Sequence, residues 1–122
     1  MKIYTSDSNV PMNTLSILQQ LVDKDRWVRC WTDYIDNYDP YYDISGYNYI
    51  KVLSIDGDIC TAHIVPIADL TDTDSVELWD KDDLEEIMSR TLYIRIADID
   101  FDVNNFKYDQ YSTSDIKDAM GL

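Results

Sequence analysis

Three aspartates alternate along one segment of the chain, at Asp98, Asp100 and Asp102. In an extended strand, alternate side chains point to the same face at intervals of about 6.6–6.8 Å. A regular row of carboxylates of this kind can attract Lys and Arg side chains, or it can bind a cation. The plainer interpretation is an ordinary half-buried strand with its polar side in water.

The same segment fits part of a calcium-binding loop. Acidic or amide residues occupy positions 1, 3, 5, 7 and 12 of the EF-hand pattern, namely Asp98, Asp100, Asp102, Asn104 and Asp109. The fit fails where the ion is most demanding, because Val103 replaces the turn glycine and Asp109 replaces the bidentate glutamate. We therefore expect no metal at this segment, and nothing else in the sequence indicates a cofactor.

A second group of acids is interleaved with tyrosines between residues 33 and 43. Its members are Asp33, Tyr34, Asp36, Tyr38, Asp39, Tyr41, Tyr42 and Asp43. Rings and carboxylates together can imitate nucleic acid, with rings in the place of bases and carboxylates in the place of phosphates. Tyrosine is also common at protein interfaces in general. A core role for some of these tyrosines is equally compatible with the sequence.

A third acidic group falls in a stretch without bases. Between Lys51 and Lys81 there is no Lys or Arg, and the candidate partner-binding acids in that stretch are Asp69, Asp72, Asp74 and Glu77. The whole chain has 24 acids against 10 bases, a net charge of −14, and 21 of the acids are aspartate. Carboxylates without neighbouring bases repel one another and oppose compaction, so this excess indicates a functional demand.

The charge excludes several classes of protein. A direct nucleic-acid binder needs a basic patch to neutralise phosphates, and an anionic membrane repels an acidic surface. Intrinsic disorder is also excluded, because 45% of the 122 residues are apolar and 12% are aromatic. We expect a single globular domain over residues 1–122.

Catalytic and targeting motifs are missing from the sequence. There is no nucleophile elbow, phosphate-binding glycine loop or dinucleotide fingerprint, and a nucleophilic set of Cys30 with His63 has no local signature. The two cysteines, Cys30 and Cys60, fit no metal-ligand spacing, so we expect buried thiols in a reducing compartment. Without a signal peptide or a long apolar run, we expect a cytoplasmic protein that is not an enzyme.

Four elements must position the first half of the chain. Apolar residues at three- and four-residue steps (Leu15, Leu18, Leu21, Val22) predict a helix over 12–24 with those residues in the core. Residues 26–35 fit either a strand or a helix, and their β-branched and aromatic content favours a strand. Pro40 places residues 36–43 in a loop. Residues 47–65 predict a hairpin with a type I′ turn at Asp56-Gly57.

The second half begins with an acidic loop over 67–80. A helix is predicted over about 80–89, with Asp80 as its cap and Leu84, Ile87 and Met88 facing inward. A long strand is predicted over 92–103, with a change of apolar phase between Ile96 and Ala97 that indicates a bulge or a passage between packed faces. A short helix ends the chain. The fold class is α+β: a small antiparallel sheet with an N-terminal helix and one or two short helices.

In overall character the chain resembles the acidic, nucleic-acid-mimicking inhibitors made by phages, such as anti-CRISPR and anti-restriction proteins. The resemblance lies in small size, acidity, tyrosine content and a single domain, and it transfers no residues. It implies a basic nucleic-acid-binding partner, such as a CRISPR effector, a restriction enzyme or another nuclease. The alternatives are an immunity or antitoxin protein that caps a cognate nuclease, and a non-catalytic phage or host accessory protein.

Overall fold

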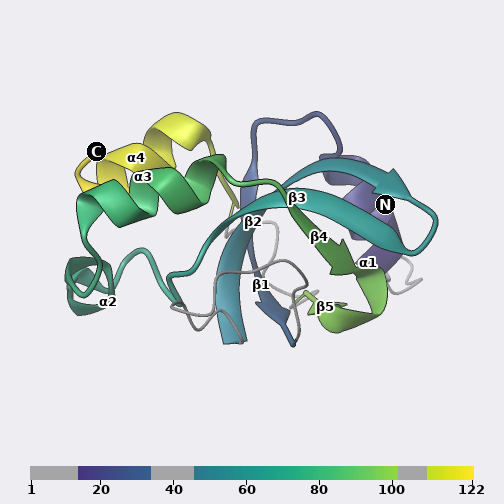
Figure 1. Ribbon diagram of the computed structural model, residues 1–122, viewed down its shortest axis with the longest axis horizontal. Coiled ribbons are helices and arrows are strands. Elements are labelled where there is room, and N and C mark those ends of the chain that lie inside the picture. Colours follow the sequence, from purple (N-terminus) through teal and green to yellow (C-terminus); the bar gives the residue numbers. More distant parts are fainter. Residues whose placement is uncertain (1–13, 34–45, 102–109) are drawn as a thin grey trace, which may run out of the picture.

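The protein is an α+β fold in which helices cover both ends of one antiparallel sheet. The computed structural model describes residues 14–33, 46–101 and 110–122. The helices are α1 (Thr14–Leu21), α2 (Thr73–Glu77), α3 (Lys81–Ser89) and α4 (Thr113–Met120). The strands are β1 (Trp27–Thr32), β2 (Gly46–Asp56), β3 (Ile59–Val65), β4 (Leu92–Arg95), β5 (Ile99–Asp100) and β6 (Gln110–Tyr111). Figure 1 shows α2, α3 and α4 gathered at one end and α1 at the other.

The sheet curls strongly, so that its two edges approach each other. Its strand order is β4-β3-β2-β1-β5, with β6 also pairing with β1. Strands β4 and β5 therefore lie at opposite ends of this order, although only the 3₁₀ helix η1 (Ile96–Asp98) separates them in the chain. The backbone N–H of Ile96 donates to the carbonyl of Asp58 (2.8 Å), and that of Asp33 donates to the carbonyl of Asp98 (3.0 Å). The turn thus ties the β2–β3 hairpin to the end of β1.

This turn corrects the prediction of one long strand over 92–103. The chain pairs with β3 as far as Arg95, turns through η1, and then pairs with β1 from Ile99. The change of apolar phase at Ile96 and Ala97 marks a 3₁₀ turn that takes the chain from one edge of the sheet to the other, and not the bulge or the passage between packed faces that the sequence predicts. A turn is required because no straight strand can pair with both edges of a curled sheet.

The central hairpin is confirmed, with a different turn. Asp56 pairs with Ile59, which leaves Gly57 and Asp58 as the two loop residues instead of Asp56-Gly57. Gly57 has a φ of 62°, and Asp58 has no positive φ. A single positive φ at the first loop position is what a type II′ turn requires, and glycine supplies it without strain. Register shifts between Val52 and Ser54, and such an irregularity increases the local twist and bend of β2.

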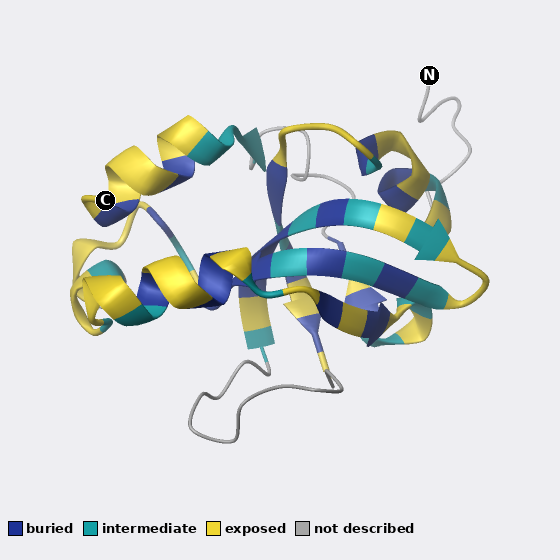
Figure 2. Ribbon diagram, turned by 45° about the horizontal axis from the view of Figure 1, so that its top comes forward, coloured by how far each residue is buried: buried dark blue, intermediate teal, exposed yellow. Residues whose placement is uncertain are grey.

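Two apolar clusters hold the molecule together. The first packs α1 against the inner face of the sheet and includes both cysteines, Cys30 and Cys60, which are buried free thiols as the sequence predicts. The second lies under α3 and α4, where Trp27 and Tyr49 contribute the largest side chains. Figure 2 shows α3 and α4 with buried residues on one side and exposed residues on the other, as amphipathic helices require.

The helices follow the sequence in most respects. The segment predicted as a strand or a helix over 26–35 contains β1, and α3 begins at its predicted cap, where the Asp80 carboxylate accepts from the backbone N–H of Asp82 (2.9 Å). The first helix is shorter than predicted, and it buries Ile17 while Leu15 is 40% exposed, so the placement of Leu15 in the core was wrong. The predicted loop 67–80 contains α2, which Asp72 caps.

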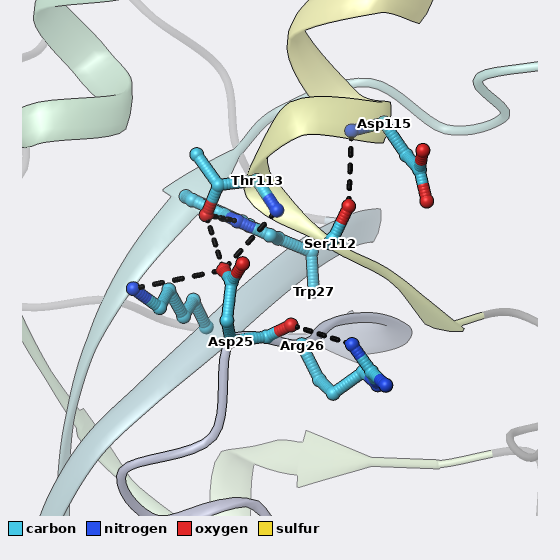
Figure 3. A network of polar contacts seen from close by, with 7 residues as sticks. Asp25, Arg26, Trp27, Ser112, Thr113 and Asp115 are labelled. Atoms are coloured by element: carbon cyan, nitrogen blue, oxygen red, sulfur yellow. Dashed lines mark hydrogen bonds and ion pairs between the residues drawn. The ribbon is translucent and has the colours of Figure 1, made fainter.

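A polar network fastens α4 to the beginning of β1 (Figure 3). The Asp25 carboxylate accepts from both the hydroxyl and the backbone N–H of Thr113, the first residue of α4. The indole N–H of Trp27 donates to the same hydroxyl (2.9 Å), and the Lys51 ammonium lies 3.9 Å from the carboxylate. The Thr113 hydroxyl is the main reason that the pKa of Asp25 lies below its ordinary value of 3.8.

We predict that Asp25→Ala lowers the free energy of unfolding by about 1 kcal/mol, because it removes the acceptor for two donors of Thr113. Since folding lowers the pKa of Asp25, its stabilising effect is complete above pH about 4 and is lost as the pH falls through the folded-state pKa. Denaturant unfolding at pH 6 and at successively lower pH measures this. The difference in the free energy of unfolding between wild type and Asp25→Ala must shrink on acidification. The control Asp118→Ala removes an exposed carboxylate of α4 outside the network. An equal loss of stability in this control would contradict the role of the network.

Candidate functional site

Two large aromatic side chains lie exposed on the outer face of the sheet. Trp31 on β1 is 40% exposed and Tyr47 on β2 is 43% exposed. The two residues are directly paired across the strands, and their rings meet edge to face with centroids 5.1 Å apart. The alternation of β1 and β2 places them there, because their neighbours Cys30 and Asn48 point to the interior. Together they form a preorganised aromatic surface open to solvent.

A guanidinium group covers one end of this pair. Arg29, two residues before Trp31 and therefore on the same face of β1, places its guanidinium carbon 4.0 Å from the centroid of the Tyr47 ring. Its Nε donates to the carbonyl of Ala68 (2.6 Å), which fixes the loop after β3 against the sheet. The charge of Arg29 is thus engaged within the molecule.

Carboxylates flank the aromatic pair at its other end. The Asp33 carboxylate accepts from the indole N–H of Trp31, and Asp100 on β5 pairs directly with Trp31 across the strands. Tyr47, Trp31 and Asp100 therefore form one row across β2, β1 and β5, at the spacing of about 4.8 Å between neighbouring strands. Both Asp33 and Asp100 are exposed.

Asp69 completes the arrangement beside Arg29. Hydrogen bonds from the hydroxyl and the backbone N–H of Thr71 lower the pKa of Asp69, and the nearby Arg29 charge lowers it further. This carboxylate therefore stays ionised well below neutral pH. We call the combined surface the aromatic–acidic face; it consists of Arg29, Trp31, Asp33, Tyr47, Asp69 and Asp100.

The alternating aspartates do not lie on one face of a single strand, as the sequence predicts. Asp98 lies in η1, where its half-buried side chain pairs with Arg95 at 3.0 Å. Asp100 lies beyond the turn on β5, and Asp102 falls outside the described residues. Of the three aspartates, Asp100 alone belongs to the aromatic–acidic face. The η1 turn brings it near Asp33 of the second acidic group, because the backbone N–H of Asp33 donates to the carbonyl of Asp98.

The remaining acids of the third group occupy a different part of the molecule. Asp72 caps α2, Asp74 lies in its first turn and Glu77 is its last residue. With α3 and α4 they form what we call the acidic lobe, residues 69–90 and 110–122. Its first segment has nine acids and two bases, and its second has two acids and one base. Asp69 lies where this lobe meets the aromatic–acidic face.

Most of the acidic tyrosine segment lies outside the described residues. Its candidate residues there are Asp36, Tyr38, Asp39, Tyr41, Tyr42 and Asp43. The segment leaves the sheet at Asp33 and returns at Gly46, and Thr32 pairs with Gly46. The described residues that flank it, Asp33 and Gly46, therefore lie close to Trp31 and Tyr47 in the chain.

Sequence reasoning missed the three residues at the centre of the face. Once 26–36 is taken as a strand, strict alternation from the buried Cys30 places Arg29 and Trp31 outside. The same alternation in the hairpin places Tyr47 outside. The signal was therefore present, but pairing Trp31 with Tyr47 requires the register between β1 and β2, which no short pattern contains.

The buried thiols and the one histidine occupy different environments. Burial raises the pKa of both thiols, that of Cys60 to about 12, so each carries its proton at neutral pH. Cys30 points into the interior, whereas Nδ1 of His63 on β3 donates to the carbonyl of Arg90 (2.6 Å). The combination of Cys30 with His63 is therefore not assembled.

No helix within residues 14–33, 46–101 and 110–122 is long and apolar enough to cross a membrane. In the same residues, no three or more His, Cys, Asp or Glu side chains are grouped as metal ligands. No protein-family model, curated protein or solved structure matches the chain.

Proposed function

We propose that the protein binds the basic nucleic-acid-binding surface of another protein and keeps nucleic acid away from it. The aromatic–acidic face is the surface that makes this contact. The observation that carries the proposal is the row of Asp100, Trp31 and Tyr47, which presents a carboxylate and two exposed rings side by side.

The chemistry of this row suits a surface built to hold nucleic acid. Such surfaces present arginine and lysine to phosphates, and arginine also stacks on bases. Carboxylates accept from the same guanidinium groups, and aromatic rings accept the same stacking through cation–π attraction. Because Trp31 and Tyr47 contact each other and Asp33 holds the indole N–H, little side-chain freedom is lost on binding.

The overall charge acts in the same direction at longer range. A net charge of −14 steers the chain toward a basic partner and repels nucleic acid from the complex. The resemblance to acidic phage inhibitors implies a CRISPR effector, a restriction enzyme or another nuclease as the partner. An immunity protein for a cognate nuclease would use the same face, so the identity of the captured partner distinguishes these cases.

The first test removes charge from the face without removing its hydrogen-bond acceptors. The partner is captured from a lysate of the source organism at low salt, purified, and titrated against the triple variant Asp33→Asn, Asp69→Asn, Asp100→Asn. Asparagine keeps the side-chain oxygen that accepts from Trp31 and Thr71. We expect the dissociation constant to rise at least about tenfold, with a shallower salt dependence, because three charge contacts are lost.

A second triple variant separates location from total charge. Asp56→Asn, Asp82→Asn, Glu85→Gln makes the same change in net charge at exposed positions outside the face. It must bind the partner within about twofold of wild type. Equal weakening by the two triple variants would show that only net charge matters, and the aromatic–acidic face would then have no role.

The second test removes a ring. We expect Trp31→Ala to weaken partner binding about tenfold, because large aromatic side chains near the centre of an interface are among the few residues that carry its binding energy. The matched control is Tyr93→Ala, since Tyr93 is 48% exposed on β4 and lies outside the face. Isothermal titration measures both variants after thermal unfolding has established that they are folded. Normal binding by Trp31→Ala would exclude the aromatic pair from the interface.

A further inference from the structure

A small cavity, which we call the basic crevice, lies where the sheet meets α3 and α4. Its volume is about 230 Å³, and it shares no residue with the aromatic–acidic face. Three strands and two helices contribute its lining, which consists of Trp27, Lys51, His63, Glu85, Met88, Ser89, Thr113 and Lys117. The residues from α3 and those from α4 lie three or four positions apart, so each helix presents one face to the crevice.

The charge of this lining is opposite in sign to that of the molecule. The whole chain has 24 acids against 10 Lys and Arg residues and has one histidine. The crevice brings together two lysines and that histidine with a single carboxylate, that of Glu85. Bases that only offset surface acids need no common cavity. Their convergence in one cavity therefore indicates that an anion binds there.

Strand pairing places two of these groups face to face. Lys51 on β2 pairs directly with His63 on β3, and the rings of His63 and Trp27 are stacked with their centroids 6.4 Å apart. Nδ1 of His63 donates to the carbonyl of Arg90 (2.6 Å), which fixes the ring and leaves Nε2 as its other polar atom. Like charges directly opposite each other destabilise a sheet, so an anion beside Lys51 and a protonated His63 relieves their repulsion.

The two lysines differ in how far their charges are used within the molecule. The Lys51 ammonium lies 3.9 Å from the Asp25 carboxylate. That carboxylate also accepts two hydrogen bonds from Thr113, so it offsets the charge of Lys51 only in part. Lys117, in the last turn of α4, forms no ion pair with a carboxylate in the described part of the chain. Its ammonium group can therefore bind a ligand.

The crevice also has an apolar wall that is already ordered. Trp27 and Met88 line it and are only 2% and 7% exposed, because both belong to the second apolar cluster. The indole N–H of Trp27 donates to the Thr113 hydroxyl (2.9 Å), as Figure 3 shows. The Ser89 hydroxyl donates to the carbonyl of Glu86 (2.7 Å). A wall held in this way loses little conformational entropy when a ligand covers it.

We propose that the basic crevice binds a small organic anion, which carries a carboxylate or phosphate group on a compact apolar body. Lys51, Lys117 and Nε2 of His63 hold the anionic group. The apolar body lies against Trp27 and Met88. The cavity is smaller than the range of about 300–1,000 Å³ that is typical for drug-sized ligands, so the occupant is a smaller molecule. This site is separate from the contact with a nucleic-acid-binding partner.

The test uses phenyl phosphate and benzoate as probes, and benzyl alcohol as a neutral molecule with the same ring. Proton–nitrogen NMR follows the indole N–H signals of the tryptophans, because Trp27 lines the crevice whereas Trp31 and Trp79 do not. We expect at least one anion to shift the Trp27 signal with a dissociation constant at or below about 1 mM. The Trp31 signal must stay in place, and benzyl alcohol must bind at least about tenfold more weakly. The tighter of the two anions identifies the preferred anionic group.

Two pairs of variants locate the charge that binds the anion. We expect Lys117→Gln to weaken binding about fivefold, whereas Lys81→Gln, with the same change in charge outside the crevice, must bind within about twofold of wild type. Removing the carboxylate of the lining must act in the opposite direction. We expect Glu85→Gln to strengthen binding about threefold and its control, Asp82→Asn, to change it less than about twofold. All four positions are exposed, so the fold is preserved.

Several results would overturn the proposal. The crevice binds no anion if neither probe gives a saturable shift of the Trp27 signal. Equal effects of Lys117→Gln and Lys81→Gln would show that only net charge matters, and weaker binding by Glu85→Gln would point to a cationic group on the ligand. Equal binding of benzyl alcohol would leave only an apolar cavity. Because no measurement uses the nucleic-acid-binding partner, failure here leaves the proposed function standing.

Discussion

The short turn of Ile96–Asp98 is the constraint on which the arrangement of the surface depends. Its backbone hydrogen bonds to Asp58 and Asp33 join the β2–β3 hairpin to the end of β1. The edge strands β4 and β5 are thereby connected by this short turn alone. Only because the sheet curls in this way does Asp100 lie opposite Trp31. The carboxylate that flanks the aromatic pair is thus positioned by the closure of the sheet and not by the spacing of acids along the chain.

The distribution of charge follows from this architecture. The acidic lobe takes most of the excess, because the segment between β3 and β4 forms α2 and α3, whose exposed sides are largely acidic and whose caps are aspartates. The sheet carries fewer acids, but it presents them next to exposed rings. Charge in the lobe can steer a basic partner over distances near the Debye length of about 8–10 Å. Charge on the aromatic–acidic face can make direct contacts.

Local signals predicted the elements whose determinants lie close together in the sequence. Asp80 before an amphipathic run located α3, and the glycine between two alternating segments located the hairpin. The long strand was wrong because its interruption comes from the curl of the whole sheet, and α2 was missed because five residues give too little periodicity. Of the predicted site, Asp33, Asp69 and Asp100 belong to the face, whereas Trp31 and Tyr47 needed the register between strands to be recognised.

If the protein acts as we propose, the aromatic–acidic face and nucleic acid compete for one surface of the partner. The most direct measurement is a titration of the complex between this protein and its captured partner with the nucleic acid that the partner binds. We expect mutually exclusive binding, with the apparent dissociation constant of this protein rising in proportion to the concentration of nucleic acid. A stable ternary complex at saturating nucleic acid, with the affinity of this protein unchanged, would contradict it.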